Sequence, residues 1–290
     1  MVKIRKAVVP VAGLGTRFLP ITKAIPKEML PIADKPLLHH IVLELVEAGV
    51  EEIVLIVNDT KESVKKYFQK DSALEKKLKD SDKDQELKTI QQIAKLAQFK
   101  FVCQKTQSGT GDAFLCAKDI IGNEPFFGCW GDDLFVAKPK NRFQQLLETF
   151  KKYPENIVAC LNDNRPESAD KYGFAAGKEI KPGLIKTTSL IEKPGLKNRP
   201  STLAVLSGFI FRPEIFKALE NFPRMPHKEL YHIDGLNVLR EQGINTYALE
   251  IKNGRHYDCG NVSSYIKSNL ELTLQNPELG PEIKKFIQTI

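Results

Sequence analysis

Residues 10–31 read PVAGLGTRFLPITKAIPKEMLP and continue an apolar run that begins near residue 6. The stretch brings together two glycines and three basic residues, namely Gly13, Gly15, Arg17, Lys23 and Lys27. Glycines leave the main chain bare, so backbone N–H groups can approach an anion closely. In open α/β sheets the first strand-to-helix loop is a favoured place for ligands. The stretch therefore predicts a loop that binds a negatively charged ligand at the end of the first strand.

Two better-known phosphate-binding loops do not fit this stretch. A Walker loop would need Gly-Lys-Ser/Thr, and a dinucleotide fingerprint would need a glycine where Phe18 stands. The glycine spacing alone is a weak signal, which a tight turn also explains. Arg17 and Lys27 favour phosphate binding, because a guanidinium fork and an ammonium group both pair with phosphate oxygens. Since closely spaced prolines disfavour a helix, we expect the loop to be extended and stiff.

Short apolar runs alternate with helical patterns along the chain. The strands that we expect in the first part lie at residues 6–13, 52–58, 99–104, 126–133 and 156–162. Between the first two, residues 35–50 have apolar side chains at helical spacing, and Gly49 is typical of a helix end. Alternation of strands and helices implies right-handed crossovers. We therefore expect an α/β fold, with a three-layer, doubly wound, mostly parallel mixed sheet of the Rossmann-like kind.

The rest of the chain shows no linker and no break in composition. Residues 60–97 predict a charged helical segment that is interrupted near residues 80–86. Later strands are expected at residues 203–211 and 246–251, and later helices at residues 232–243 and 262–276. We interpret residues 1–290 as one domain, with C-terminal helices from about residue 262. Those helices could pack on the same body or mediate self-association.

Composition restricts the classes of function. The formal net charge of +7 raises the possibility of a nucleic-acid partner, but many of the lysines are interleaved with acids between residues 61 and 105, as on a solvated helix face. A small polyanionic substrate fits better than a polymer. No apolar run is long enough to span a bilayer, and the N-terminus lacks a signal-peptide pattern. The five scattered cysteines predict reduced thiols in a cytoplasmic protein.

Several short motifs follow the loop in order: QKTQSGTGDA (104–113), GDD (131–133), YG (172–173), EKP (192–194), SGFIF (207–211) and HYDCGN (256–261). Together with the loop they resemble the sugar-nucleotide pyrophosphorylases over nearly the whole chain. KAIPKEMLP in the loop is similar to the bacterial members that use UTP. The resemblance implies a nucleotidyltransferase fold and transfer of uridylyl from UTP to α-D-glucose 1-phosphate, which forms UDP-glucose and pyrophosphate. It also implies Mg²⁺ and a homo-oligomer.

The implied reaction explains which residue types are needed. A sugar phosphate carries about −1.5 to −2 charges at pH 7, so its oxygen can attack the α-phosphorus of UTP without a general base. Two anions must still be brought together and aligned in line. We therefore expect cations around the phosphates and acids that hold Mg²⁺.

The resemblance assigns roles to individual residues. The expected catalytic cations are Arg17, Lys27 and Lys193. The expected nucleotide-binding residues are Ala12, Gly13, Gly15, Gln104 and Gly109. The expected sugar-binding residues are Gly173, Glu192 and Gly208, and the expected metal ligands are Asp132 and Asp258. Taken alone, each aspartate would be interpreted as a turn residue, and Glu192 with Lys193 as a solvated ion pair.

Two departures and three alternatives remain open. The family often has histidine where Asp112 stands, and Leu-Pro where Trp130 and Gly131 stand. A thymidylyltransferase or another hexose-1-phosphate nucleotidyltransferase is a close alternative, because one methyl group is worth only about 1–3 kcal/mol of discrimination. A non-catalytic subunit that senses nucleotide sugars is an alternative of another class, although it would not need the expected cations and aspartates. A nucleic-acid-binding module is the third, and it rests on the charge alone.

Overall fold

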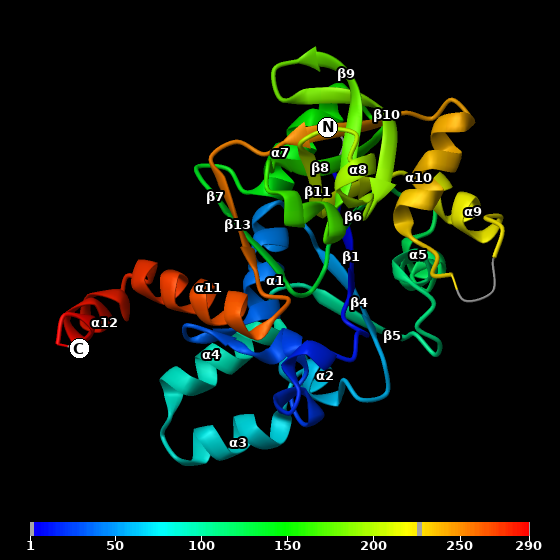
Figure 1. Cartoon of the computed structure of the whole chain (residues 1–290). Coiled ribbons are helices and arrows are strands. Elements are labelled where there is room, and N and C mark those ends of the chain that lie inside the picture. Colours follow the sequence, from blue (N-terminus) through cyan, green and yellow to red (C-terminus); the bar gives the residue numbers. More distant parts are fainter. Residues whose placement is uncertain (1–2, 225–227, 290) are drawn as a thin grey trace.

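The computed structural model of the chain describes residues 3–224 and 228–289 (Figure 1). Its centre is a mixed sheet of nine strands in the order β5-β4-β1-β6-β11-β8-β12-β10-β9. These strands are β1 (Lys6–Pro10), β4 (Glu52–Val57), β5 (Gln98–Cys103), β6 (Phe126–Gly128), β8 (Asn156–Asn162), β9 (Gly173–Lys181), β10 (Leu184–Glu192), β11 (Leu203–Phe211) and β12 (Thr246–Glu250). Two small sheets pair β2 (Pro31–Ile32) with β3 (Lys35–Pro36) and β7 (Asp133–Ala137) with β13 (Gly254–Asp258).

Helices cover both faces of the large sheet, which confirms the three-layer α/β prediction. Successive residues of β4 alternate between two hydrophobic clusters, since Ile53 and Leu55 belong to one and Val54 and Ile56 to the other. The first cluster includes side chains of α1 (Leu37–Glu47), α2 (Glu62–Phe68) and α7 (Arg142–Lys152). The second includes side chains of α5 (Thr110–Leu115), α6 (Lys118–Ile121), α9 (Glu214–Glu220) and α10 (His232–Glu241).

The sheet is parallel in one part and mostly antiparallel in the other. Strand β1 runs parallel to β4 and β6, and β4 runs parallel to β5. Strand β11 is antiparallel to β6 and β8, and the hairpin β9–β10 adds two more antiparallel strands. The parallel arrangement that the sequence predicts therefore describes the N-terminal part of the sheet, and the hairpin was not among the expected strands.

The other predicted elements are present with shifted boundaries. The charged segment consists of α2, α3 (Ser72–Asp80) and α4 (Asp84–Ala94), and the break before α4 lies where it was predicted. The C-terminal helices are α11 (Val262–Gln275) and α12 (Gly280–Ile287), which extend away from the sheet (Figure 1). Among the residues that the structure describes, no helix has the length and apolar character needed to cross a membrane.

The loop after β1 is folded into short helical turns, so our prediction of an extended loop is wrong. It forms three 3-10 turns, η1 (Thr16–Phe18), η2 (Ile21–Lys23) and η3 (Lys27–Met29). Pro20 and Pro26 directly precede the second and third turns, and the Met29 N–H donates to the Pro26 carbonyl at 2.8 Å. A proline at this place keeps its carbonyl as an acceptor and loses only an N–H that the turn does not use. The prolines therefore lie between successive turns and do not prevent the turns from forming.

The predicted strand at residues 126–133 is split in two. Strand β6 ends at Gly128, and the chain leaves the large sheet before β7 begins at Asp133 in the small sheet with β13. Asp132 therefore lies between two sheets, at a point where a carboxylate can face a cavity.

Candidate active site

Two adjoining cavities lie at the carboxyl ends of β1 and β6. The first, here called the loop cavity, is lined by the start of the loop after β1, including Ala12 and Gly13. The second, here called the hairpin cavity, is lined by residues of the β9–β10 hairpin, including Gly173 and Glu192. Four residues line both cavities and form the wall between them, Thr110, Trp130, Asp132 and Lys193. A ligand with two parts could therefore occupy both cavities across this wall.

Main chain forms one side of the loop cavity. The carbonyl of Ala12 accepts hydrogen bonds from the side-chain amides of Asn58, at 2.6 Å, and Gln107, at 2.7 Å. A Cβ atom placed on Gly13 would lie 3.7 Å from the ammonium nitrogen of Lys27. The glycine therefore keeps the space between the backbone and the lysine free of side-chain atoms.

Lys27 projects from η3 toward the wall. Its Nζ lies 2.5 Å from Oδ2 of Asp132 and 4.0 Å from a carboxylate oxygen of Glu28. Burial lowers the pKa of Lys27, but the two carboxylates outweigh that effect and raise its pKa above the usual value. The ammonium group is therefore charged at neutral pH. The other carboxylate oxygen of Glu28 forms an ion pair with Nζ of the buried Lys61 at 2.7 Å.

The far side of the loop cavity contains Gln104 and Gly109. Gln104 follows β5, is 6% exposed, and donates from Nε2 to a carboxylate oxygen of Asp112 at 3.0 Å. Gly109 has a φ of +109°, and a Cβ there would lie 2.4 Å from the carbonyl oxygen of Leu230. Only glycine fits this position, because another residue would be strained and would displace the segment of Leu230.

The hairpin cavity is built around Glu192. Gly173 pairs with Glu192 in the β9–β10 register, and a Cβ on this glycine would lie 3.0 Å from the Glu192 carboxylate. Burial raises the pKa of Glu192, and the nearby Lys193 partly offsets that effect. Lys193 has a φ of +43°, an uncommon conformation for a side chain of this kind, which turns the chain at the end of β10.

The two adjacent aspartates of the GDD motif have different surroundings. Asp132 lines both cavities, whereas Asp133 lines the hairpin cavity alone and accepts a hydrogen bond from the Ser207 N–H at 3.0 Å. The other oxygen of Asp133 forms an ion pair with Nε2 of His256 at 2.6 Å. Burial raises the pKa of Asp133, but His256, together with Arg142 and the Ser207 N–H, outweighs burial and lowers the pKa below its usual value. The oxygens of Asp133 are thus occupied by protein partners, and of these two aspartates Asp132 alone lines both cavities.

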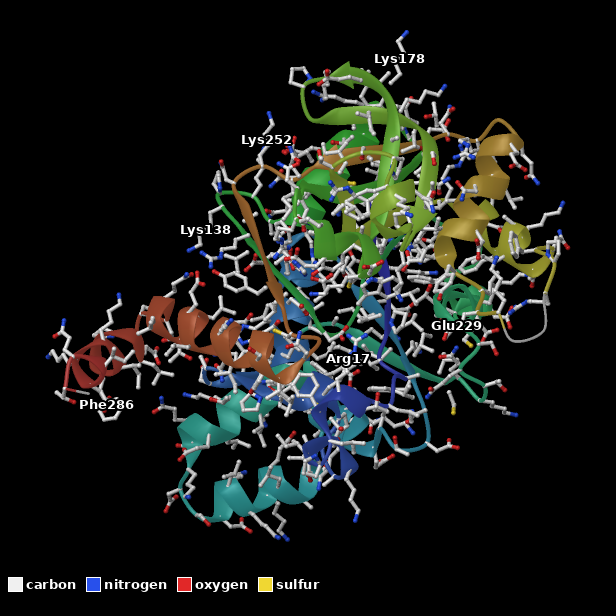
Figure 2. All side chains as sticks on the ribbon, in the orientation of Figure 1. Arg17, Lys138, Lys178, Glu229, Lys252 and Phe286 are labelled. Atoms are coloured by element: carbon white, nitrogen blue, oxygen red, sulfur yellow. The ribbon has the colours of Figure 1, made fainter. Side chains whose placement is uncertain are left out.

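Asp258 comes to the same cavity from the other strand of the small sheet. It pairs with Asp133 in the β13–β7 register and lines the hairpin cavity together with Asp132. One of its oxygens accepts from the Gly260 N–H at 2.7 Å. Arg17 also lines this cavity, and a Cβ on Gly260 would lie 3.6 Å from its guanidinium group. Figure 2 shows Arg17 near the centre of the molecule, beside the loop that leads into α11.

Two of the predicted site residues, Gly15 and Gly208, are not among the residues that line either cavity. Gly15 has a φ of +68°, and its carbonyl accepts from the Thr22 hydroxyl at 2.8 Å within the loop. Gly208 has a φ of +136°, and a Cβ there would lie 3.1 Å from Ala159 and 3.3 Å from Arg142. The side of Gly208 that would bear a side chain therefore faces the core, and core packing is sufficient to explain this glycine.

Sequence reasoning missed a group of buried polar residues behind the aspartates. Arg142 is fully buried, donates to the Ser207 carbonyl at 2.7 Å and to the Asp133 carbonyl at 3.1 Å, and forms an ion pair with Glu44 at 3.0 Å. Burial raises the pKa of Glu44, and Arg142 partly offsets that effect. His256 could have been found, because it lies two residues before Asp258 and so faces the same side of the strand. Nothing in the sequence distinguishes Arg142 from a surface arginine.

Comparison with known proteins agrees with this geometry. The sequence model of the family described as nucleotidyl transferase matches residues 6–275. The chain belongs to the nucleotidyl transferase family. One relative within it is a UTP–glucose-1-phosphate uridylyltransferase of Bacillus subtilis (strain 168), which is 37% identical over 99% of this chain and 96% of its own length.

Two solved structures of nucleotidyl transferases with bound ligands are also similar. A UDP-glucose pyrophosphorylase complexed with UDP-glucose has a TM-score of 0.84 and 35% identity, over 94% of this chain and 100% of its own. A UTP-bound UGPase from Acinetobacter baumannii has a TM-score of 0.89 and 32% identity, over 98% of this chain and 99% of its own. These likenesses confirm the predicted fold and family of the chain.

Proposed function

We propose that this nucleotidyl transferase moves the uridylyl group of UTP onto α-D-glucose 1-phosphate and so forms UDP-glucose and pyrophosphate. The observation that carries the proposal is the common wall of the two cavities, which presents Asp132 and Lys193 to both. One cavity is bounded by bare main chain, as a nucleotide requires, and the other contains a half-buried carboxylate that can accept from sugar hydroxyls. The names of the relatives support these two substrates.

In this proposal the loop cavity takes the nucleotide. Ala12 and Gly13 contact it through main chain, Gly109 lets the backbone come close to the base, and Gln104 binds the base edge. Gly15 contributes by shaping the loop and not by lining the cavity.

The hairpin cavity takes the sugar phosphate. Glu192 accepts from hexose hydroxyls, and Gly173 leaves the space in which its carboxylate lies. Lys193 reaches the wall from the end of β10 and binds the sugar phosphate. A role for Gly208 next to the sugar rests on the family resemblance alone.

Asp132 and Asp258 would hold Mg²⁺. Across residues 3–224 and 228–289, no group of three or more His, Cys, Asp and Glu side chains is arranged to bind a metal ion. Two carboxylates that line one cavity still fit Mg²⁺, which commonly takes one or two protein carboxylates and completes its shell with water and substrate phosphates. When bound, the ion would neutralise charge on the reacting phosphates.

Three cationic side chains of the protein bind the phosphates and neutralise their charge. Lys193 holds the attacking phosphate of the sugar, and Lys27 stands on the nucleotide side of the wall, where charge builds up on the triphosphate. Arg17 adds a guanidinium group beside Asp258. Fixed charges of this kind cost no reorganisation during the reaction, so positioning and neutralisation can supply most of the rate.

An assay of pyrophosphate release tests the proposal. We expect turnover with UTP, Mg²⁺ and glucose 1-phosphate, loss of turnover on chelation of the metal, and slower turnover with other sugar 1-phosphates. Faster turnover with dTTP than with UTP would favour the thymidylyltransferase alternative. Binding of UDP-glucose without turnover under any of these conditions would favour the non-catalytic sensing subunit.

Three further expectations are retained as part of this proposal. The chain forms a single domain over residues 1–290, since the large sheet takes strands from both halves of the chain. It assembles as a homo-oligomer, and it is cytoplasmic. The last expectation rests on the cysteines, all five of which are free thiols.

A further inference from the structure

Gln104 and Asp112 form a pair at the edge of the loop cavity. Gln104 lines the cavity, and its own N–H donates to the Val57 carbonyl at 2.8 Å, which fixes the start of its side chain. Its Nε2 donates to Oδ2 of Asp112 at 3.0 Å. The other oxygen of Asp112 lies 3.5 Å from the guanidinium group of Arg224, which is about half exposed.

The chemistry of Asp112 fixes the direction of the Gln104 amide. An amide can be turned over so that its oxygen and nitrogen exchange places, and in many proteins either orientation is possible. A carboxylate has only acceptors, so it binds the nitrogen end and repels the oxygen end. With Asp112 at this place, Gln104 must direct Nε2 toward the carboxylate and Oε1 away from it.

The oxygen of this amide is left without a donor. Within residues 3–224 and 228–289, no donor makes a hydrogen bond to Oε1 of Gln104, although the residue is 6% exposed. Oε1 and the second hydrogen of Nε2 lie side by side on one edge of the amide. That edge can bind a partner that presents a donor next to an acceptor.

We propose that Asp112 is a specificity-determining residue, which holds Gln104 in the orientation that binds uracil and rejects cytosine. Uracil presents N3–H as a donor beside O4 as an acceptor, whereas cytosine presents N3 as an acceptor beside an N4 donor. Binding of cytosine would require the amide to turn over and place its oxygen against Asp112. The inference rests on the proposed position of the nucleotide base in the loop cavity.

The same geometry does not discriminate between uracil and thymine. The two bases have identical edges at N3 and O4 and differ only by a methyl group at C5. Asp112 therefore excludes CTP but leaves the choice between UTP and dTTP to packing around that methyl group.

Substitution Asp112→Asn tests the inference, because the new amide has nearly the same shape and can either accept from Gln104 or donate to it. We expect the ratio of kcat/KM for UTP to that for CTP to fall about tenfold to a hundredfold, the range of one bidentate base contact. Most of the change should come from improved use of CTP. Far-UV circular dichroism and a thermal melt verify that the variant is folded.

Two control variants isolate the effect. Asp119→Asn makes the same chemical change at an exposed position of α6 and should leave the ratio unchanged. Arg224→Gln removes the ion pair with Asp112 but leaves the carboxylate in place, so it too should leave the ratio unchanged. An equal fall in the ratio for either control would overturn the inference.

Gln104→Ala separates failure of the inference from failure of the proposed site. If the base binds in the loop cavity, this variant should raise KM for UTP and bring the UTP and CTP values closer together. If KM for UTP does not change, the base binds elsewhere, and both the proposed site and the inference are wrong. If KM rises but Asp112→Asn leaves the ratio unchanged, the proposed site stands and the inference is overturned.

Discussion

Lys27 shows how a single side chain combines charge with a fixed position. Its loop lies at the surface, but the residue is only partly exposed, because Asp132 and Glu28 hold its ammonium group at the wall. The sequence predicted a cation here from the nearby glycines, in a loop that we expected to be extended and stiff. The partner aspartate is 105 residues away along the chain, so local pattern could not reveal the contact.

We predict that Lys27→Ala lowers kcat about a hundredfold or more and leaves the fold intact. The loss of one fixed charge at a site where charge develops typically has an effect of this size. Pyrophosphate release under saturating substrates measures the rate, and a thermal melt measures the fold. Lys23→Ala is the matched control, because Lys23 lies in the same loop and is exposed. Wild-type turnover in the Lys27 variant would remove this residue from the active site.

The aspartates also show the limit of sequence reasoning for single residues. GDD gives no indication which carboxylate faces a ligand, and the choice of Asp132 came from the family resemblance. The structure separates the two by their contacts, because Asp133 is paired with His256 and Asp132 is not.

The small β7–β13 sheet is the element that brings the two proposed metal ligands together. Asp132 directly precedes β7, and Asp258 ends β13. The ion pair of Asp133 with His256 links the two strands by their side chains, in addition to the backbone register. Asp133 and Asp258 are 125 positions apart in the sequence, so no local pattern could indicate that they pair.

Asp133→Ala should destabilise the protein more than Asp132→Ala does. Removal of one partner from a fully buried pair typically costs about 3–5 kcal/mol, and we expect a smaller loss here because His256 and Asp133 are 11% and 14% exposed. Urea denaturation of both variants measures the free energy of unfolding. Asp132→Ala should lose the Mg²⁺-dependent rate with little change in stability, because its carboxylate is partly exposed. Equal midpoints for the two variants would show that the His256 contact does not hold the strands together.

Elements differ in how well the sequence predicted them. Strands β1, β4 and β8 are apolar runs buried on both faces of the sheet, and all three were predicted. The hairpin β9–β10 was missed, because residues 177–181 read GKEIK and are exposed. An exposed strand lacks the apolar alternation on which prediction depends. The prediction of an extended loop after β1 was wrong for a different reason, because the prolines of this loop precede turns and do not interrupt them.

At the scale of the whole molecule, the sheet joins a parallel part and an antiparallel part at β6. This strand pairs with β1 in parallel and with β11 in antiparallel orientation. The alternation of strands and helices predicted the first part, together with the three layers. The second part could not be derived in this way, because the order of strands in the sheet depends on long-range pairing that a local pattern does not encode.

Two buried histidines should each disfavour the folded state in mild acid. Burial lowers the pKa of His39 to about 4 and that of His232 to about 3. An unfolded histidine takes up a proton near pH 6.5, so the unfolded state binds more protons than the folded state below that pH. The contribution of these two histidines to the free energy of unfolding should therefore decrease as the pH falls from about 6.5 toward 4.

His39→Gln tests this pH dependence away from the active site. His39 lies in α1, where its ring nitrogen is 2.9 Å from the Tyr67 hydroxyl, and glutamine can keep a hydrogen bond there. Relative to the variant, the wild type should have a lower urea midpoint at about pH 5 than it has at about pH 7, because only the wild type has the histidine that takes up a proton on unfolding. Identical pH dependence in the two proteins would contradict the prediction.

The partition formed by Thr110, Trp130, Asp132 and Lys193 has a consequence for how this enzyme can evolve. Each of these residues lines both cavities, so if the cavities bind the two substrates as proposed, a change that admits a different hexose also alters the contacts of the nucleotide. The two Michaelis constants are then not independent quantities. Variants selected for a new sugar at this partition should have altered affinity for the nucleotide. Substitutions at residues that contact only the hexose should admit a new sugar 1-phosphate without that effect.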